Sequence, residues 1–231
     1  MFCSSPYEYV FHRCANGEEI AVSGLGSLSV FLLGKDTETR IKVQNSEDLM
    51  EEGDLLQGEG QEIVVKVKGG AAVFLAVGVR GPCPAKSRLA LTRAAQLYKV
   101  TKPWGHELWL NGVHPLYAFK QIFVKAGHKT SLQYHKFKRE TNVLLDGVAK
   151  LHYQGNASVP LDKVSTQDTT SLRLESVCVV DVFPNTVHRL EAVTDILLYE
   201  SSTPHLDDVI RIQDDTMRPD GRIEREHPAA S

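Results

Sequence analysis

Four side chains in the second half of the sequence could together hold a metal ion. Gln133 and His135 are two residues apart, so on a β-strand both side chains project from the same face. Glu140 can return to that face after a tight turn, and His188 begins a further expected strand. One amide oxygen, one carboxylate and two imidazole nitrogens suit a divalent cation and leave positions open for a substrate. The spacing therefore predicts a metal site formed by Gln133, His135, Glu140 and His188.

The histidines are concentrated in the same half of the chain. Of the nine histidines, only His12 precedes residue 106, so imidazole chemistry is expected after that point. A weak internal repeat relates the two halves, because residues 54–61 can be aligned with residues 181–188. Gln61 then stands at the position of His188, and the first half is expected to be structural.

Short apolar segments must position these side chains. Such segments recur about every ten residues and are separated by Gly, Asn and Asp. This rhythm is typical of an all-β sandwich or barrel. Many segments alternate or contain β-branched residues, as half-buried strands do. The expected strands are residues 7–14, 27–33, 40–43, 63–67 and 72–79 in the first half, and 107–110, 118–124, 130–134, 142–145, 149–152, 176–182, 188–192 and 195–200 in the second.

One segment has a helical pattern. In residues 87–98, apolar side chains recur at i, i+4 and i+8 after a Gly-Pro-Cys-Pro sequence that breaks helices. We therefore expect a short helical linker over residues 85–97. Residues 155–171 are rich in Ser, Thr, Asp and Gln and are expected to form a surface loop. Residues 216–231 hold no apolar period and are expected to be a flexible tail.

The composition is that of a soluble globular protein. The 231 residues include 26 Lys and Arg against 29 Asp and Glu, a formal net charge of −3. This balance, without a basic stripe, argues against nucleic-acid binding. The longest uncharged apolar stretch, residues 69–79, is about half of a bilayer-spanning helix, and no signal-peptide pattern opens the chain, so we expect a cytoplasmic protein that does not bind membranes. Four scattered cysteines form no Cys-x-x-Cys pair and are expected to be reduced thiols.

The spacing of the candidate ligands resembles two motifs of the cupin superfamily. Residues 127–147 read Gly-x5-Gln-x-His-x4-Glu-x6-Gly, and Pro-x3-His follows at residues 184–188. Gln in place of the usual first His resembles the mannose-6-phosphate isomerase branch, in which a Gln, His, Glu and His set holds the metal. The likeness to the cupin domain of bacterial type II isomerases extends over residues 98–215. It includes Lys-Pro-Trp-Gly-x-Glu at 102–107, Phe-Lys-x-Ile-x-Val-x-Ala-Gly at 119–127, His-Arg-Leu-Glu at 188–191, Glu200, and Asp-Asp-Val-Ile-Arg at 207–211.

The resemblance implies an all-β bicupin, two antiparallel jelly-roll barrels joined by the short helical linker. It implies a degenerate cupin-like domain without metal ligands over residues 1–84 and a metal-binding cupin domain over residues 98–215. A homodimer is expected by the same analogy. The second motif departs from the family pattern, because Thr186 replaces a Gly and one residue fewer precedes His188.

The implied activity is a metal-dependent aldose-ketose isomerisation of a sugar phosphate through an enediolate. One divalent ion, Zn before Mn, Fe, Co or Ni, would polarise the substrate oxygens and stabilise the enediolate charge. Lys138 is the candidate base or electrostatic helper, because Lys-x-Glu resembles an arrangement in type I isomerases. As a base, Lys138 would need a lowered pKa. Lys120 and Arg189 match positions of the type II pattern and are expected to hold the phosphate or the enediolate.

Two other functions stay open at this point. A cupin metal-dependent oxygenase is one, although such enzymes usually have three His with a carboxylate around iron, and Gln133 argues against it. A non-catalytic sugar-binding cupin is the other, and the ligand-free first half and the altered second motif favour it. Oxygen uptake with Fe(II) would support the oxygenase. Failure to retain stoichiometric metal would support the sugar-binding protein.

Overall fold

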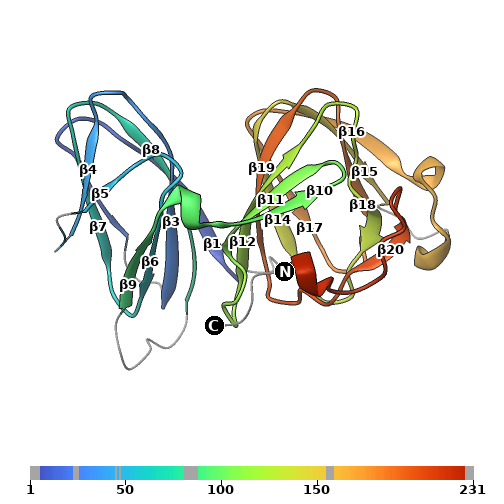
Figure 1. The fold of residues 1–231 in the computed structure, drawn as a ribbon. Helices are drawn as coiled ribbons and strands as arrows, with labels where there is room; N and C mark the ends of the chain where they lie inside the picture. Colours follow the sequence, from blue (N-terminus) through green and yellow to red (C-terminus); the bar gives the residue numbers. More distant parts are fainter. Residues whose placement is uncertain are drawn as a thin grey trace, which may run out of the picture. The chain divides into compact units, whose positions relative to one another are not determined.

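The chain forms two compact β-rich units, Met1–Leu97 and Tyr98–Ser231, here called unit 1 and unit 2. The computed structural model describes residues 6–22, 26–44, 46, 48–80, 88–154 and 159–226. Antiparallel strands dominate these residues, which confirms the expected all-β class (Figure 1). None of the described helices has the length and apolar character needed to cross a membrane. The described helical elements are 3-10 turns at Ala94–Gln96, Leu161–Lys163, Thr166–Asp168 and Glu224–Glu226, labelled η1 to η4.

Unit 1 consists of two antiparallel sheets whose apolar faces form its core. In β7, Ile63, Val65 and Val67 are buried while Lys66 and Lys68 are exposed, the alternation of a strand with one face on a core. The first sheet has the order β1-β8-β3-β6-β9 and the second the order β2-β7-β4-β5. The strands are β1 Glu8–Cys14, β2 Glu19–Val22, β3 Ser27–Lys35, β4 Arg40–Val43, β5 Leu49–Met50, β6 Leu55–Glu59, β7 Ile63–Lys68, β8 Ala72–Val79 and β9 Arg88–Thr92.

The predicted helical linker is wrong. Residues 88–92 form strand β9, which pairs with β6 of unit 1, and only Ala94–Gln96 make a short 3-10 turn. Leu89 and Leu91 are two residues apart, as on one face of a strand, and both pack against the core of unit 1. The helical pattern is short, and pairing with the free edge of β6 outweighs it. The Gly-Pro-Cys-Pro sequence lies outside the described residues.

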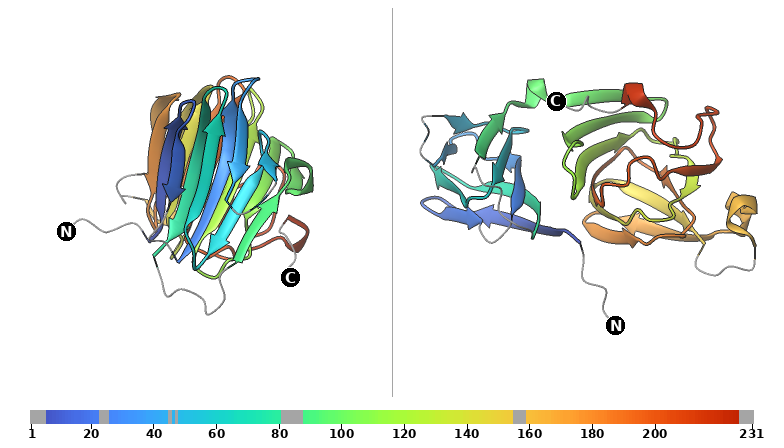
Figure 2. Two further views of the ribbon diagram at one scale, coloured as in Figure 1. Left: turned by 90° about the vertical axis from the view of Figure 1, so that its left-hand side faces the viewer. Right: turned by 90° about the horizontal axis from the view of Figure 1, so that it is seen from below.

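Unit 2 also consists of two antiparallel sheets, with six and five strands. Their orders are β10-β11-β12-β19-β14-β17 and β16-β15-β18-β13-β20, and Figure 2 shows the strands arranged around a common interior. Apolar residues such as Ile122, Leu144 and Leu198 fill one part of that interior. The strands are β10 Tyr98–Lys102, β11 Gly105–Asn111, β12 Ala118–Val124, β13 Leu132–Tyr134, β14 Glu140–Asp146, β15 Val148–Tyr153, β16 Thr170–Glu175, β17 Cys178–Val182, β18 His188–Ala192, β19 Ile196–Ser202 and β20 Ile210–Gln213.

The two units repeat one order of strand pairing. In unit 1 the paired rows are β1-β8-β3-β6 and β2-β7-β4-β5, and in unit 2 they are β12-β19-β14-β17 and β13-β18-β15-β16. Strands β1 to β8 therefore correspond in sequence to strands β12 to β19. Strands β3 and β14 even share a register shift, at Leu32/Gly34 and at Leu144/Asp146. The relation between the two halves is a repeat of topology.

The strand pairing corrects the alignment expected from the sequence. Ile63 begins β7 and pairs with Val22 of β2. His188 likewise begins β18 and pairs with Gln133 of β13. His188 therefore corresponds to Ile63, and not to Gln61, which precedes β7. The sequence alignment misses this correspondence because the connection before β18 is longer than the connection before β7.

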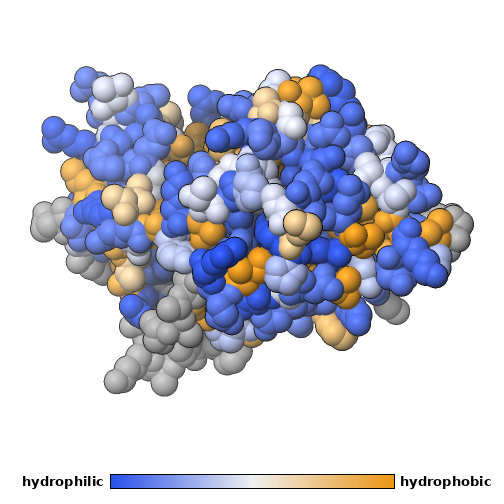
Figure 3. Space-filling model, turned by 45° about the vertical axis from the view of Figure 1, so that its right-hand side comes forward, coloured by the Kyte–Doolittle hydropathy of each residue, from blue (hydrophilic) through white to orange (hydrophobic). Residues whose placement is uncertain are grey.

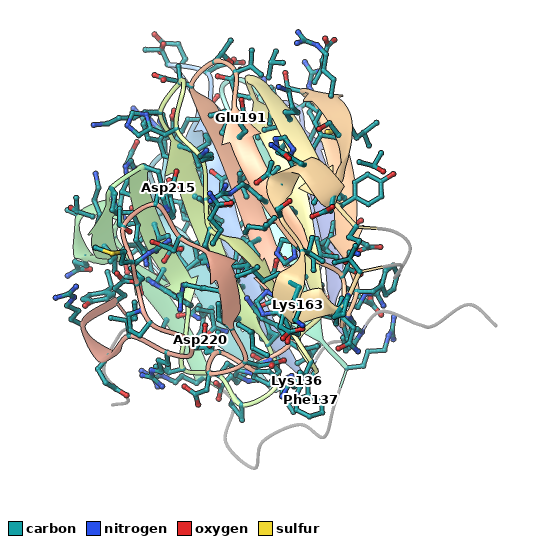
Figure 4. The ribbon with its side chains drawn as sticks, turned by 90° about the vertical axis from the view of Figure 1, so that its right-hand side faces the viewer. Lys136, Phe137, Lys163, Glu191, Asp215 and Asp220 are labelled. Atoms are coloured by element: carbon teal, nitrogen blue, oxygen red, sulfur yellow. The ribbon has the colours of Figure 1, made fainter. Side chains whose placement is uncertain are left out.

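Residues 216–226 were expected to belong to a flexible tail, and the structure corrects this expectation. The backbone nitrogen of Gly221 donates to the carbonyl of Val209 at 2.8 Å, and that of Arg211 donates to Asp220 Oδ1 at 2.7 Å. Glu226 is buried. Polar contacts therefore hold this segment on unit 2, and Figure 4 shows Asp220 on it. Residues 227–231 lie outside the described residues.

The surface is mainly hydrophilic on the face that Figure 3 shows, and hydrophobic side chains lie on it in small groups. Among the described residues, the most exposed large apolar side chains are Met217, Phe137 and Val177, which come from three separate segments. Single exposed apolar residues are ordinary in globular proteins. The side chains suited to chemistry lie in the interior of unit 2 instead.

Candidate metal centre

Three of the four predicted ligands meet inside unit 2. His135 follows β13, Glu140 begins β14 and His188 begins β18. Nε2 of His135 lies 3.1 Å from Glu140 Oε1, and Nε2 of His188 lies 3.5 Å from Glu140 Oε2. One possible ligand atom from each residue lies within 4.8 Å of the other two, and all three side chains are buried. These residues have the types and the closeness of a compact metal centre.

Both imidazoles have their second nitrogen fixed by the backbone. Nδ1 of His135 donates to the carbonyl oxygen of Asp208, and Nδ1 of His188 donates to that of Thr186 at 3.0 Å. Because a carbonyl oxygen only accepts, each Nδ1 carries a proton and each Nε2 remains as the metal-binding atom. Metal-binding histidines are commonly held in this way. Thr186, the departure from the family motif, thus orients His188 through its carbonyl.

Gln133, the fourth predicted ligand, lies beside the same cluster. Its Nε2 is 3.5 Å from His135 Nε2, and its Oε1 accepts a hydrogen bond from Ser131 Oγ at 2.6 Å. In this orientation the amide nitrogen faces the cluster. A half-turn of the amide would turn its oxygen to a metal ion and let its nitrogen donate to Ser131 Oγ. Gln133 is in place beside the centre, and its role as a ligand stays a prediction.

A buried lysine is paired with the carboxylate of the centre. Nζ of Lys138 lies 2.5 Å from Glu140 Oε1 and 2.9 Å from Glu200 Oε1. Burial alone would lower the pKa of Lys138, but the two carboxylates outweigh it and hold the pKa above its ordinary value. Burial would raise the pKa of Glu140, and Lys138 and His135 instead hold it well below its usual range. Lys138 is an ammonium in this environment, which favours an electrostatic role over that of a base.

Further lysines and glutamates continue this pair through the interior. Lys120 Nζ lies 3.2 Å from Glu200 Oε2 and 3.3 Å from Glu107 Oε1. Lys102 Nζ lies 3.2 Å from Glu107 Oε2 and also pairs with Glu226. Burial would raise the pKa of Glu107, but Lys120 and Lys102 lower it to about 2. We call this alternating series of buried charges the charge row: Glu226, Lys102, Glu107, Lys120, Glu200, Lys138 and Glu140.

Asp208 supports the loop that carries Lys138. Its carboxylate accepts hydrogen bonds from the backbone nitrogens of Lys136, Phe137 and Lys138, at 3.0, 2.5 and 2.9 Å. Burial would raise the pKa of Asp208, but these three N–H groups hold it below its usual range. Figure 4 places Lys136 and Phe137 at the lower edge of unit 2. Because its carbonyl also orients His135, Asp208 fixes both a ligand and the loop after it.

Arg189 does not lie where the resemblance predicts. It follows His188 on β18, so its side chain leaves the opposite face of the strand. Its guanidinium donates to the carbonyl oxygens of Thr130 and Gln213, at 2.7 and 3.3 Å, and lies 3.3 Å from Asp215 Oδ1. The expected role of Arg189 in holding the substrate is therefore wrong. It is a buried cation that joins three segments of the unit.

The metal centre and the charge row border one open pocket in unit 2. Lys120 and Lys138 line the pocket, and their roles toward a substrate stay predictions. Trp104 lines it as well, and its buried indole nitrogen has no hydrogen-bond partner among the described residues.

Sequence reasoning assigned no chemical role to several residues of the pocket. Lys102, Glu107 and Glu200 entered only as parts of the family pattern, and Glu226 was assigned to the tail. Lys102, Glu107 and Glu200 come from β10, β11 and β19, where apolar neighbours on the same strands are buried. A charged residue at a buried strand position is the signal that could have identified them.

Comparisons with known proteins agree with this fold. A family model described as mannose-6-phosphate isomerase C-terminal matches residues 91–214. An oxalate decarboxylase of Bacillus subtilis, a protein with Mn(II) centres, matches with a TM-score of 0.66 and 12% identity, over 90% of this chain and 71% of its own. The oxalate decarboxylase of Lactobacillus farciminis, as its formate complex, matches with a TM-score of 0.64 and 12% identity, over 89% and 79%. At this identity the structures show a shared cupin fold alone. No curated protein matches the sequence.

Proposed function

The chain belongs to the mannose-6-phosphate isomerase C-terminal family, and we propose that it is a metal-dependent sugar-phosphate isomerase. The proposed reaction interconverts an aldose phosphate and a ketose phosphate through an enediolate. The observation that carries this proposal is the cluster of His135, Glu140 and His188 in a pocket lined by buried lysines. Such a pocket combines a place for a divalent ion with fixed positive charge, and both stabilise the negative charge of an enediolate.

The residues of the cluster fit a divalent metal ion. The two Nε2 atoms and the Glu140 carboxylate already face one another, and the Gln133 amide lies beside them. Imidazole, carboxylate and amide ligands suit Zn, which we favour, and also Mn, Fe, Co or Ni. When bound, the ion supplies Lewis-acid polarisation of the carbonyl and hydroxyl oxygens at the reacting carbons.

The side chains of the pocket supply the other contributions to the proposed reaction. Lys138 and Lys120 place two ammonium groups on the pocket wall, held by their carboxylate partners. Negative charge that develops on substrate oxygens is therefore met by cations that need no reorganisation. The burial of these groups strengthens each electrostatic interaction relative to water.

We propose that unit 1 is a degenerate cupin, so that the whole chain is a bicupin with its metal in unit 2 alone. The support is the shared order of eight strands in the two units. In the part of unit 1 that the structure describes, no three His, Cys, Asp or Glu side chains come together as metal ligands. The connection between the two barrels is the strand β9 and a 3-10 turn instead of the expected helix.

The experiment that tests this function is solvent-deuterium incorporation at C1 or C2 of a panel of hexose and pentose phosphates. The metal-stripped protein is resupplied with single divalent ions, so the substrate and the ion are identified together. We expect metal-dependent exchange in the wild type and a loss of at least about 100-fold in His188→Ala. His106→Ala is the matched control, because His106 stacks on Phe123 and does not line the pocket.

Absence of exchange with every sugar phosphate, although the protein holds metal, would contradict the isomerase. Oxygen uptake on adding Fe(II) and substrate would then indicate a cupin oxygenase. A chain that retains no stoichiometric metal would instead indicate a non-catalytic sugar-binding cupin.

A further inference from the structure

A carboxylate from the C-terminal segment lies inside the pocket. Residues 224–226 form a 3-10 turn in which Glu224 and Arg225 are exposed and Glu226 is buried. Glu226 pairs with Nζ of Lys102 and lines the pocket that the metal centre borders. Arg211 lines the same pocket. Glu226 is therefore a buried carboxylate in a pocket that Lys102 and Arg211 also line.

The strands already supply enough carboxylates to balance the lysines of the charge row. Its three lysines have three glutamate partners that belong to β11, β14 and β19, namely Glu107, Glu140 and Glu200. Glu226 is thus a fourth carboxylate, and it comes from outside the barrel strands. Its negative charge is in excess of what the three lysines require.

Arg211 is the cation lining this pocket whose guanidinium has no carboxylate bonded to it among the described residues. Its Nη1 donates to the carbonyl oxygens of Pro219 and Gly221, which are neutral. Its Nε is buried and has no hydrogen-bond partner among the described residues. Burial and Arg218 lower the pKa of Arg211, whereas Asp214, Glu226 and Asp220 act to raise it, so Glu226 is one of three carboxylates that interact electrostatically with Arg211. Arg211 therefore keeps a guanidinium N–H that no described group accepts.

The turn that carries Glu226 has few described attachments to the barrel. Tyr98 Oη donates to the carbonyl of Arg225 at 3.1 Å, and Glu226 N donates to Ile223 O inside the turn at 2.8 Å. Glu107 and Glu200, in contrast, lie on strands that pair on both sides. Release of Glu226 from Lys102 therefore disturbs the turn and leaves the sheets intact.

We propose that Glu226 occupies an anion subsite formed by Lys102 and Arg211, and that the phosphate group of the substrate displaces it. This inference rests on the proposed function for the class of substrate. A phosphate ester carries up to two negative charges and accepts hydrogen bonds from ammonium and guanidinium groups, so it competes with a single carboxylate. A sugar without phosphate cannot displace Glu226, so the turn selects for phosphorylated substrates and lowers their affinity.

The test is calorimetric titration of inorganic phosphate into the metal-stripped full chain at fixed ionic strength. Glu226→Gln removes the competing charge, and we expect phosphate to bind about tenfold more tightly than to the wild type. Glu224→Gln is the matched control, because Glu224 lies in the same turn with its side chain 88% exposed. The control is expected to bind phosphate like the wild type, because an exposed charge is screened by salt.

Two further variants guard against a folding defect in Glu226→Gln. Tyr98→Phe removes the hydrogen bond to Arg225 without changing a charge, and we expect about twofold tighter phosphate binding. Lys102→Met in the Glu226→Gln background is expected to cancel the tenfold gain.

Unchanged or weaker phosphate binding in both Glu226→Gln and Tyr98→Phe would overturn the proposal, as would a gain that survives Lys102→Met. Because the titration uses no sugar and no metal, its result is separate from the deuterium-exchange test of the isomerase. A gain in phosphate binding without sugar-phosphate exchange would leave the subsite standing and reject the isomerase alone.

Discussion

Unit 1 and unit 2 pair eight strands in the same order, yet the residues that face their interiors differ in kind. The register shifts of β3 and β14 align the two strands. Leu28 lies four residues before the shift of β3, and Glu140 lies four residues before the shift of β14, so the two residues correspond. Ile63 begins β7, where β18 begins with His188. Leu28 and Ile63 belong to the apolar core of unit 1, whereas Glu140 and His188 form the candidate metal centre. One topology thus supports either a filled core or a site, and a few interior residues decide which.

The two interiors also differ in how their space is used. In unit 1 a Cβ atom added at Gly58 would lie 2.8 Å from Ile63 Cγ1, so the apolar interior is full at this point. In unit 2 the charge row lines an open pocket. Buried ion pairs repay their desolvation poorly, so they are weak contributors to stability. The charges of unit 2 are therefore better explained by function than by folding.

The largest expected effect comes from making unit 2 resemble unit 1 at a single position. Glu140→Leu places the residue of unit 1 in unit 2 and leaves Lys138 buried without its nearer carboxylate. We expect the free energy of unfolding of unit 2 to fall by about 3–5 kcal/mol, because removing one partner of a buried ion pair is strongly destabilising and Lys138 then keeps Glu200 alone. Both tryptophans, Trp104 and Trp109, lie in unit 2, so urea unfolding followed by tryptophan fluorescence reports on this unit.

The matched control removes both charges of the pair. Lys138→Met combined with Glu140→Leu is expected to recover most of the lost stability, because replacing a whole ion pair by apolar residues is often neutral. If Glu140→Leu and the double variant had equal free energies of unfolding, the pairing of Lys138 with Glu140 would not be what distinguishes the interior of unit 2 from that of unit 1.

Acid should weaken unit 2 through Glu107. Its pKa is about 2 in the folded chain against an ordinary value of 4.5, so the unfolded chain binds a proton that the folded chain does not. The stabilisation is complete above pH 4.5 and is lost as the pH falls toward 2, by about 3 kcal/mol. We expect the difference in unfolding free energy between wild type and Glu107→Gln, measured by tryptophan fluorescence, to shrink over this range. A difference that is constant with pH would contradict this role of Glu107.

A smaller effect is expected outside the eight shared strands. Asp208 lies between β19 and β20, and Asp208→Asn weakens the three N–H contacts that hold the loop after His135. We expect metal affinity to fall about tenfold with the fold retained, because supporting partners of this kind tune a metal site. Competition with a chromogenic chelator measures the change, and Asp207→Asn is the control because no contact of its side chain with the loop is described. If Asp208→Asn and Asp207→Asn bound metal equally well, Asp208 would not support the metal site, and only residues of the eight shared strands would determine its affinity.

The sequence predicted the central strands better than the edges of the sheets. The expected ranges 40–43, 72–79, 118–124 and 188–192 coincide with β4, β8, β12 and β18, where alternating or apolar residues face a core. Strands β2, β5, β6, β9, β10, β16 and β20 were missed, and all of them except β6 lie at a sheet edge. An edge strand buries less of its surface, so its hydrophobic pattern is weak, and pairing with a neighbour decides its structure.

The candidate site was predictable where its residues follow a local spacing. His135 and Glu140 are close in sequence, the Pro-x3-His motif locates His188, and the structure brings these three side chains together. The charge row was not predictable, because its partners come from strands far apart in the sequence. Arg189 shows the opposite error, since it directly follows the ligand His188 on an expected strand, and alternation along the strand places its side chain on the other face.

The most direct test of the metal centre counts the divalent ions that the full chain retains after dialysis against Zn. Elemental analysis of the wild type and of His188→Ile, which carries the residue of unit 1, gives the count per chain. One ion in the wild type and none in His188→Ile is the result that the structure predicts. A wild type without metal, or a His188→Ile chain that still holds one ion, would contradict a centre formed by His135, Glu140 and His188.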